Sequence, residues 1–448
     1  MTTFADLGLS ARLLGALDKT LLKAPTPIQV QAIPYIMQGR DLMGLAQTGT
    51  GKTAAFGLPL LHRLLDIGHP PGPRQVRALI LSPTRELTTQ IKTNLEVFTK
   101  GTPVKVTLVV GGASIFRQSQ SLAKGTDVLV ATPGRLIDLL ERGDVSLEQC
   151  GYLVLDEADH MLDMGFIHAL RRIAKHIPVK RQTMLFSATM PKDIEEIAST
   201  YLRDPVRVQV ASPGKPADRI SQGVHFTPQG DKAKLLESYL LKHPGEQALV
   251  FGRTKHGSEK LCKLLATWGF KVGSIHGNKS QGQRDRTLTE FRNSELDVLV
   301  ATDVAARGID IPTVRHVYNY DLPNVPENYV HRIGRTARAG MDGASLSFCA
   351  PAEMGELAAI EKMLKTALPV VGGAPWGIAD IRAVPKPAPR GGHGQRQGAK
   401  PGGKPAQKQG GKPQGRPQPQ GGLDAPKKAN RPHRGRGGKP QGGRGAAA

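Results

Sequence analysis

Short apolar runs recur along the first 190 residues, separated by stretches with a helical period. Their hydrophobicity is mostly continuous rather than alternating, which is typical of strands in a parallel sheet covered on both faces. The runs are residues 42–45, 77–81, 104–110, 127–130, 152–155 and 183–186. An open α/β sheet binds its ligands at the carboxyl ends of its strands, and polar motifs or glycine-rich turns follow these runs. The pattern therefore predicts an α/β domain with a ligand site at one edge of its sheet.

A second set of such runs predicts a second α/β domain. The runs are residues 248–251, 272–275, 297–300, 314–318 and 344–348, with helical patterns between them, for example at 258–267. Residues 206–211 alternate like a half-exposed strand, and residues 212–216 carry two prolines and a glycine, which interrupt regular structure. We expect a first domain at 1–205, a linker at 206–219 and a second domain at 220–368.

The composition changes at the end of the chain. Residues 385–448 contain 15 Lys and Arg against one acid, Asp424, and no Phe, Tyr or Trp. Such a segment buries too little apolar surface to offset its chain entropy, and residues 369–384 show no clear periodicity, so we expect disorder over 369–448. Of the formal net charge of +23, the segment 385–448 supplies 15 − 1 = +14 and the rest about +9. A basic body with a cationic arm indicates a polyanionic partner, most simply nucleic acid; a tail that only aids solubility is the alternative.

The three cysteines, Cys150, Cys262 and Cys349, stand far apart and form no C-x-x-C pair. Their spacing indicates neither a disulfide framework nor a structural zinc site. The amino terminus has no basic segment followed by an apolar run and a small-residue cleavage site, and no stretch approaches eighteen apolar residues. These features predict a soluble, cytoplasmic protein.

A phosphate-binding loop follows the apolar run 42–45. The loop matches the general phosphate-binding pattern, except that Ala46 replaces its first glycine. Its residues are Ala46, Gln47, Thr48, Gly49, Thr50, Gly51, Lys52 and Thr53. Glycines let backbone N–H groups approach phosphates, Lys52 is suited to the β and γ oxygens, and the Thr53 hydroxyl can ligate Mg²⁺. Pro59 conflicts with the helical pattern that follows, so we expect a kink or an early stop there.

Two carboxylates follow the run 152–155. Asp156 and Glu157 would lie at the same sheet edge as the phosphate loop, because parallel strands end at one edge. In that position Asp156 would hold Mg²⁺ and Glu157 would orient or deprotonate an attacking water. An acidic start of a helix is the alternative interpretation.

The order of these motifs with His331 to Arg338 resembles that of DEAD-box RNA helicases, and the long basic tail is most similar to the bacterial RhlE-like group. The resemblance covers about residues 4–365. It implies two tandem RecA-like parallel-sheet domains, an ATP-binding domain followed by a helicase C-terminal domain, with ATP and Mg²⁺ as cofactors.

The resemblance also implies an adenine-reading segment. Gln29, in the run Pro25 to Gln29, would read the adenine edge through its amide, and Phe4 stands where the family has an upstream aromatic. Leu21 and Leu22 replace the usual glycine and aromatic, which puts adenine stacking in doubt. A polar residue at a helix start is the alternative for Gln29.

RNA contacts are implied at short motifs in both domains. By position they fall on Thr84, Arg85, Gly112, Thr132, Arg135, Arg253, Gln281, Arg284 and Thr302. Hydroxyls, N–H groups and guanidinium groups suit phosphate oxygens and carry little sequence information. The family motif that couples hydrolysis to unwinding would be Ser187 and Thr189, together with His331. Each residue taken alone is equally consistent with a turn or a helix cap.

In the second domain the resemblance assigns Arg335 and Arg338 to the γ-phosphate and Asp310 to the ribose. The two arginines are three positions apart and can point the same way from a helical turn. Ala337 replaces a more usual glycine.

The implied function is an ATP hydrolase and RNA helicase that unwinds short duplexes locally and non-processively and remodels ribonucleoproteins. ATP and RNA would bind across both domains, with single-stranded and short duplex RNA as partners and ribosomal particles or the RNA-decay machinery as further candidates. An RNA clamp that uses hydrolysis only to time release, and a DNA-directed motor, remain alternatives.

Overall fold

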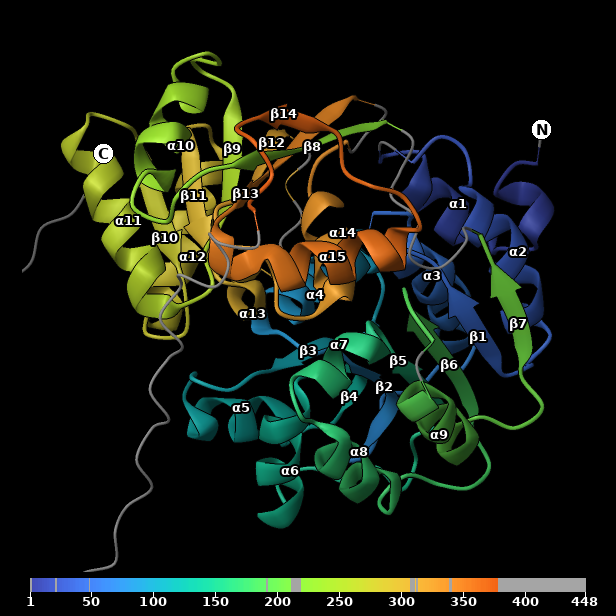
Figure 1. Cartoon of the computed structure of the whole chain (residues 1–448). Helices are drawn as coiled ribbons and strands as arrows, with labels where there is room; N and C mark the ends of the chain where they lie inside the picture. Colours follow the sequence, from blue (N-terminus) through green and yellow to red (C-terminus); the bar gives the residue numbers. More distant parts are fainter. Residues whose placement is uncertain are drawn as a thin grey trace, which may run out of the picture. The chain divides into compact units, whose positions relative to one another are not determined.

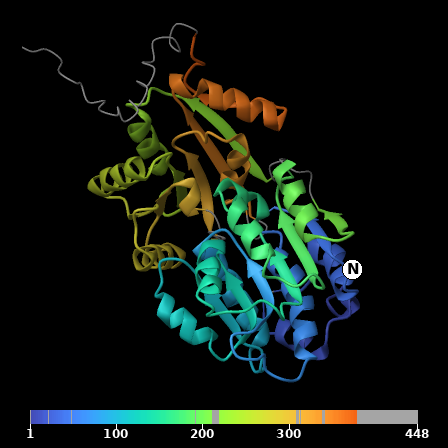
Figure 2. The same ribbon diagram turned by 90° about the horizontal axis from the view of Figure 1, so that it is seen from below.

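The computed structural model describes residues 2–20, 22–47, 49–190, 192–210, 219–306, 311, 313–337 and 341–377. The strands of this part form two seven-stranded sheets, and every strand pair is parallel. Figures 1 and 2 show each sheet with helices on its two sides. We call residues 2–210 the first lobe and residues 219–377 the second lobe.

The first sheet has the order β3-β4-β2-β5-β6-β1-β7. Its strands are β1 Leu42–Leu45, β2 Val76–Leu81, β3 Val106–Val109, β4 Thr126–Ala131, β5 Tyr152–Leu155, β6 Gln182–Ser187 and β7 Val206–Gln209. On β2, Ala78 and Ile80 belong to one hydrophobic cluster and Leu79 and Leu81 to another. Successive strand side chains point to opposite faces, so both faces of the sheet are covered, as the continuous apolar runs predict.

Helices pack on both faces of this sheet. They are η1 Ala5–Leu7, α1 Ala11–Leu17, α2 Pro27–Met37, α3 Lys52–Leu65, α4 Arg85–Thr99, α5 Ile115–Leu122, α6 Pro133–Glu141, α7 Ala158–Asp163, α8 Ile167–Ala174 and α9 Lys192–Tyr201. Of the kink or early stop expected at Pro59, the early stop is wrong, because α3 continues through it to Leu65. Residues 54–61 of this helix are all buried, and this packing outweighs the loss of one backbone hydrogen bond.

The second sheet has the order β10-β11-β9-β12-β13-β8-β14. Its strands are β8 Ile220–Phe226, β9 Gln247–Phe251, β10 Val272–Ile275, β11 Val298–Ala301, β12 Val314–Asn319, β13 Gly343–Cys349 and β14 Val370–Gly372. Its helices are α10 Lys232–Leu240, α11 Lys255–Thr267, α12 Gln281–Arg292, α13 Asp303–Ala306, α14 Pro326–Ile333, η2 Pro351–Glu353 and α15 Met354–Leu364. The two lobes therefore repeat one architecture, as expected.

Two boundaries differ from the sequence-based expectation. Residues 206–209, assigned to the linker, form β7 and pair with β1, so the first lobe extends past residue 205. Residues 370–372, grouped with the tail, form β14 and pair with β8, and the indole N–H of Trp376 donates to the Cys349 carbonyl at 2.9 Å. Because β14 has three residues and its valines are half exposed, it has no apolar periodicity to detect. The rest of the expected linker at 211–218 and of the tail at 378–448 lies outside the described residues.

The three cysteines form no disulfide. In the part of the chain that the structure describes, no helix is both long and apolar enough to span a bilayer.

Candidate nucleotide-binding site and contacts between the lobes

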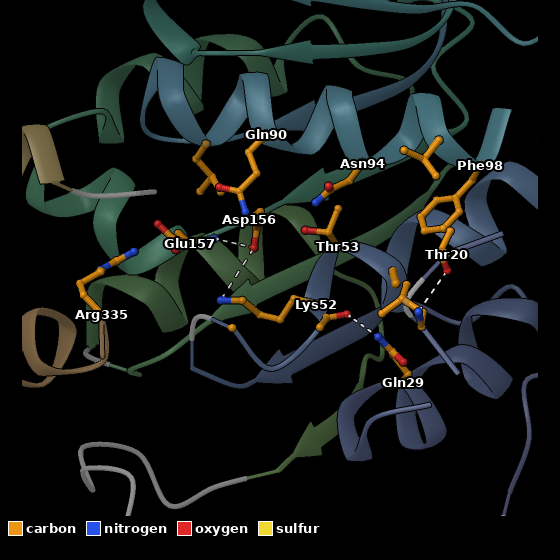
Figure 3. A pocket seen from close by; sticks show the side chains of 16 residues that line it. Thr20, Gln29, Lys52, Thr53, Gln90, Asn94, Phe98, Asp156, Glu157 and Arg335 are labelled. Carbon is orange, nitrogen blue, oxygen red and sulfur yellow. Dashed lines mark hydrogen bonds and ion pairs between the residues drawn. The ribbon is translucent and has the colours of Figure 1, made fainter. Parts of the chain in front are cut away.

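A pocket of about 410 Å³ lies at the carboxyl edge of the first sheet (Figure 3). The loop after β1, the residues after β5 and one side of α4 line it, and Arg335 reaches it from the second lobe. Of the expected ATP-site residues, the pocket brings together Gln29, Gly49, Gly51, Lys52, Thr53, Asp156, Glu157 and Arg335. Thr48, Asp310 and Arg338 lie outside the described residues.

The loop backbone requires glycine at position 51. Its φ is +92°, and a Cβ there would come within 2.5 Å of Gln29 Nε2. The Gln29 amide donates to the Gly51 carbonyl at 3.0 Å and accepts from the Thr26 N–H at 2.9 Å, in a capping box at the start of α2. Gln29 thus supports both the helix start and the phosphate loop. An adenine contact would use the second N–H and the second lone pair of the same amide.

The other loop residues connect the loop to its surroundings. Ala46 is buried, and its N–H donates to the Ser187 carbonyl at 3.0 Å, which continues the β1–β6 ladder. The Thr50 hydroxyl donates to the Gln47 carbonyl at 2.8 Å. Gln47 borders a small cavity shared with Thr189 and His331.

Lys52 is the most informative side chain of the pocket. It begins α3 with 6% of its surface exposed, and its Nζ lies 3.9 Å from Asp156 Oδ1. Among the described residues, no atom accepts a hydrogen bond from this ammonium group. A buried cation with unused donors is costly, and an anion at the N-terminus of α3 would satisfy it.

The two carboxylates after β5 have different electrostatic environments. Burial raises the pKa of Asp156 to about 6, although Lys52 opposes the rise. Burial would also raise the pKa of Glu157, but the charge and hydrogen bond of His160, followed by Lys52 and Arg335, hold it below its usual range. His160 Nδ1 lies 2.9 Å from Glu157 Oε2. Glu157 is therefore ionised at neutral pH and fixed in orientation.

The backbone of Glu157 is strained. Its φ of +52° places it in the left-handed region, which is uncommon for a residue other than glycine. Strain of this kind persists where the surrounding structure imposes it, and it concentrates at functional sites.

A polar network joins the pocket to the second lobe. Asp159 Oδ2 accepts from the N–H groups of Ala188 and Thr189 at 3.0 and 2.9 Å and from the Thr189 hydroxyl at 3.0 Å. The same oxygen lies 3.9 Å from His331 Nε2, and the His331 ring contacts His160 edge-on with centroids 4.1 Å apart. Burial, then His160, lowers the pKa of His331 to about 3, so its imidazole is neutral. The expected coupling residues Thr189 and His331 thus meet at Asp159, while Ser187 donates to the Thr189 carbonyl at 2.7 Å.

Residues expected to contact RNA meet across the lobes at Glu86. Arg284 of α12 lies 3.0 Å from Glu86 Oε1, and the Gln281 amide donates to the same oxygen at 3.3 Å. Arg85 donates to Gln281 Oε1 at 3.1 Å. The guanidinium of Arg85 also covers Gly112, where a Cβ would come within 2.1 Å of it.

The remaining expected RNA contacts mostly have local partners. Thr84 and Thr132 are the N-cap residues of α4 and α6, and Arg135 donates to the Ala113 carbonyl at 2.9 Å. The Thr302 carbonyl accepts from the Ala305 N–H at 3.0 Å. Arg253 donates to Glu353 Oε1 at 2.9 Å, within the second lobe.

Comparison with known proteins decides the family. A DEAD/DEAH box helicase model matches residues 26–197, and a helicase conserved C-terminal domain model matches residues 231–340. The ATP-dependent RNA helicase CshA of Limosilactobacillus reuteri is 45% identical over 362 residues, which are 81% of this chain and 72% of that protein. This chain belongs to the DEAD-box ATP-dependent RNA helicases.

Solved structures agree with this assignment. S. cerevisiae Dbp5 bound to RNA and ADP BeF3 matches with a TM-score of 0.75 at 31% identity, over 83% of this chain and 96% of that one. Mss116p bound to ssRNA and AMP-PNP matches with a TM-score of 0.76 at 28% identity, over 84% and 80%. The tandem RecA-like fold is confirmed, and the protein is an ATP-hydrolysing RNA helicase. Its place in the RhlE-like group stays a prediction, because the named sequence relatives are CshA proteins.

One wall of the helicase pocket was not predicted from the sequence. Gln90, Asn94 and Phe98 line it from α4 (Figure 3), and their four-residue spacing places them on one side of that helix. The spacing was the available signal, but it is indistinguishable from ordinary helix packing. The roles of Glu86 and His160 were not predicted for a different reason. The partners of Glu86 lie on α12, in the other lobe. His160 was not singled out because its partner Glu157 already had a role as part of a recognised motif.

The adenine-reading segment is only partly represented in the pocket. Leu22 and Thr20 line it, and Leu21 lies outside the described residues. Phe4 is 6% exposed, packs in the core of the first lobe and is not among the lining residues. Its expected role at the nucleotide therefore stays a prediction without support from the pocket.

Proposed function

We propose that this helicase hydrolyses ATP in the pocket between the phosphate loop and Arg335, and that Lys52 binds the β and γ phosphates there. The observation that carries the proposal is the buried Lys52 ammonium, which has no hydrogen-bond acceptor among the described residues and faces the carboxylates (Figure 3). The triphosphate supplies the missing acceptors, and the N–H groups at the start of α3 add to its binding.

Glu157 is the proposed acceptor of the proton from the attacking water. It is ionised at neutral pH, and the hydrogen bond with His160 holds the carboxylate in one orientation. Arg335 completes the pocket from the second lobe, and we propose that it stabilises the charge that develops on the transferred phosphate, together with Arg338. Asp310 is proposed for the ribose.

The donor set also fits Mg²⁺. A buried carboxylate, Asp156, and a hydroxyl, Thr53, line the same pocket, and oxygen ligands are those that Mg²⁺ prefers. When bound, the ion would neutralise phosphate charge. Asp156 has to be ionised to serve as a ligand, so the raised pKa of this group makes the site sensitive to mild acid.

We further propose that RNA lies along both lobes near the Arg85, Gln281 and Arg284 group. The solved relatives Dbp5 and Mss116p are described as bound to RNA and to ssRNA, which supports RNA as the polymer. Contacts to 2′-hydroxyl groups would select RNA over DNA. The proposed outcome is local, non-processive unwinding and ribonucleoprotein remodelling in the cytoplasm, with ribosomal particles or the decay machinery as candidate partners.

The test compares Lys52→Ala and Glu157→Gln in the full-length protein. Both should lose RNA-stimulated ATP hydrolysis by at least about a hundredfold, since each removes a group that acts on the phosphates or the attacking water. Only Lys52→Ala should also weaken ATP binding. The exposed residues Lys124 and Glu148 provide matched controls, Lys124→Ala and Glu148→Gln, which should keep full activity.

Unchanged turnover in either pocket variant would remove the proposed roles. Strand displacement and stimulation by RNA and DNA of equal length are measured on the same preparations. Hydrolysis without displacement would indicate an RNA clamp, and equal stimulation by DNA would indicate a DNA-directed motor.

A further inference from the structure

Two histidines and a glutamate meet in the second lobe, away from the ATP pocket. His243 and Glu246 belong to the turn between α10 and β9, and His316 belongs to β12. One ligand atom from each of the three side chains lies within 4.8 Å of the other two. A hydrogen bond joins His316 Nε2 to Glu246 Oε2, and His243 Nδ1 lies 3.8 Å from that oxygen. The two imidazole rings are 4.2 Å apart between centroids.

The side chains of this cluster are of kinds that ligate cations, two imidazoles and a carboxylate. Neutral imidazole and ionised carboxylate are the forms that ligate metal ions. Arg315 and Lys242 are the neighbouring cations; Arg315 donates to the Asp342 carbonyl, and the Lys242 ammonium lies over the Tyr239 ring.

The cluster is also open on one side. A cavity of about 210 Å³ is bordered by His243 and His316 together with Tyr239 and Tyr318. Glu246 is half exposed and lies on a turn, so it can shift by the small distance needed to admit an ion between its oxygen and His316. Three protein ligands beside a water-accessible space are typical of a zinc site that keeps one exchangeable position.

We propose that His243, Glu246 and His316 bind a divalent transition-metal ion of the zinc class, with water as the fourth ligand. The ion takes the place of the proton shared by His316 Nε2 and Glu246, and that proton is released or moves to Nδ1. Two nitrogens and one oxygen favour Zn²⁺, Ni²⁺ or Cu²⁺ over Mg²⁺, which prefers oxygen ligands. Binding would fasten the turn at 243–246 to β12 and stabilise the second lobe.

The experiment titrates Zn²⁺ into the full-length protein after removal of metal by a chelator, and follows heat release and thermal unfolding. Co²⁺ serves as a second probe, because tetrahedral Co²⁺ absorbs strongly in the visible range. The wild type should bind one equivalent that His243→Asn and Glu246→Gln each weaken more than about a hundredfold, since even outer ligands change metal affinity by 10- to 100-fold. Zn²⁺ should raise the melting temperature of the wild type but not of either variant.

The exposed residue His256 on α11 provides the matched control. His256→Asn should bind Zn²⁺ as the wild type does, which separates this site from adventitious binding by the other histidines of the chain. Both cluster variants change surface side chains, and their melting temperatures without metal report whether they are folded. The same stoichiometry and affinity in the wild type and in both cluster variants would overturn the proposal, as would the absence of any Zn²⁺ binding. In either case the three residues only hold the turn against the strand.

Discussion

The two lobes repeat one strand order but use their charges differently. Counted from one to seven within each lobe, both sheets have the order 3-4-2-5-6-1-7. A lysine begins the helix after the first strand in each lobe, Lys52 on α3 and Lys232 on α10. An aspartate follows the fifth strand in each lobe, and the Nζ–Oδ1 distances are 3.9 Å for Lys52–Asp156 and 3.8 Å for Lys232–Asp321.

The difference lies in what satisfies the lysine. Lys232 is fully buried, donates to the Tyr320 carbonyl at 2.8 Å and pairs with Glu353. The Glu353 carboxylate also accepts from the Leu322 and Ala350 N–H groups, at 3.0 and 3.1 Å. The Glu353 carboxylate accepts a hydrogen bond from Lys232, as we propose that a phosphate of ATP accepts one from Lys52. No comparable side chain reaches Lys52 within the described residues.

Lysines at equivalent positions of the two lobes thus have different roles, one in ligand binding and one in the stability of the fold. A buried charge that the chain itself satisfies contributes to the structure, whereas a buried charge left without hydrogen-bond acceptors marks a ligand site. In the second lobe the lysine is therefore satisfied by Glu353, and that lobe contributes Arg335 to the pocket of the first lobe.

The largest expected effect is on ATP turnover when Arg335 is replaced. Arg335→Ala should lower RNA-stimulated turnover by a factor of about 10³ to 10⁵, or roughly 4 to 7 kcal/mol, as for other arginines supplied to a transferred phosphate. The affinity for ATP should change little, because the phosphate loop remains intact. Single-turnover hydrolysis and nucleotide binding are the measurements, with the exposed Arg315→Ala as control. A loss of ATP affinity with unchanged turnover at saturating ATP would place Arg335 in ground-state binding.

Replacement of the two lysines should change the stability of the protein by different amounts. Lys232→Met removes one partner of a buried ion pair and should lower the free energy of unfolding by about 3 to 5 kcal/mol. Lys52→Met should cost less in the nucleotide-free protein, because Lys52 donates no hydrogen bond and lies 3.9 Å from its one ion-pair partner, Asp156. Urea unfolding of both variants, with the exposed Lys234→Met as control, decides the point. Similar losses in both variants would mean that Lys52 is structural.

The pH dependence of stability should separate the two carboxylates of the pocket. Because the pKa of Asp156 rises from 3.8 to about 6 in the folded state, its ionised form opposes folding above pH 6, by at most roughly 3 kcal/mol. Asp156→Asn should therefore stabilise the nucleotide-free protein at pH 7.5, and the gain should vanish as the pH falls to 4. Glu157→Gln should have the opposite sign at pH 7.5, since the pKa of Glu157 is lowered by folding. Melting curves between pH 4 and 8 without Mg²⁺ test both signs.

The smallest effect concerns backbone strain. Ala337 has a φ of +56° and Glu157 a φ of +52°, so each lobe holds one residue in the left-handed region next to the pocket motifs. Ala337→Gly should stabilise the second lobe by up to about 1 kcal/mol, because glycine adopts this conformation without steric cost. Differential melting measures the gain, and a loss of stability would show that the Ala337 methyl group contributes more by packing than it costs in strain.

Much of the fold and of the site could be predicted because the signals are local. Apolar runs such as 152–155 show in the sequence that both faces of a strand are covered, and the strand edge then brings Asp156 near Lys52. Where the signal was weak, the prediction was wrong or absent. β14 pairs through its backbone with half-exposed side chains, and α3 passes Pro59 because its surroundings bury it.

By itself, the sequence determined the number of lobes, the parallel sheets, the phosphate loop and the family to which the chain belongs. It also placed two lysines at helix starts, without indicating which of them would bind a ligand. Only the tertiary structure decided that Lys232 meets Glu353, 121 residues away, while Lys52 keeps unused donors. It likewise brought Arg284 to Glu86 and His316 to Glu246. Such pairings depend on where distant segments of the chain come together in the fold, and no local pattern of residues encodes that position.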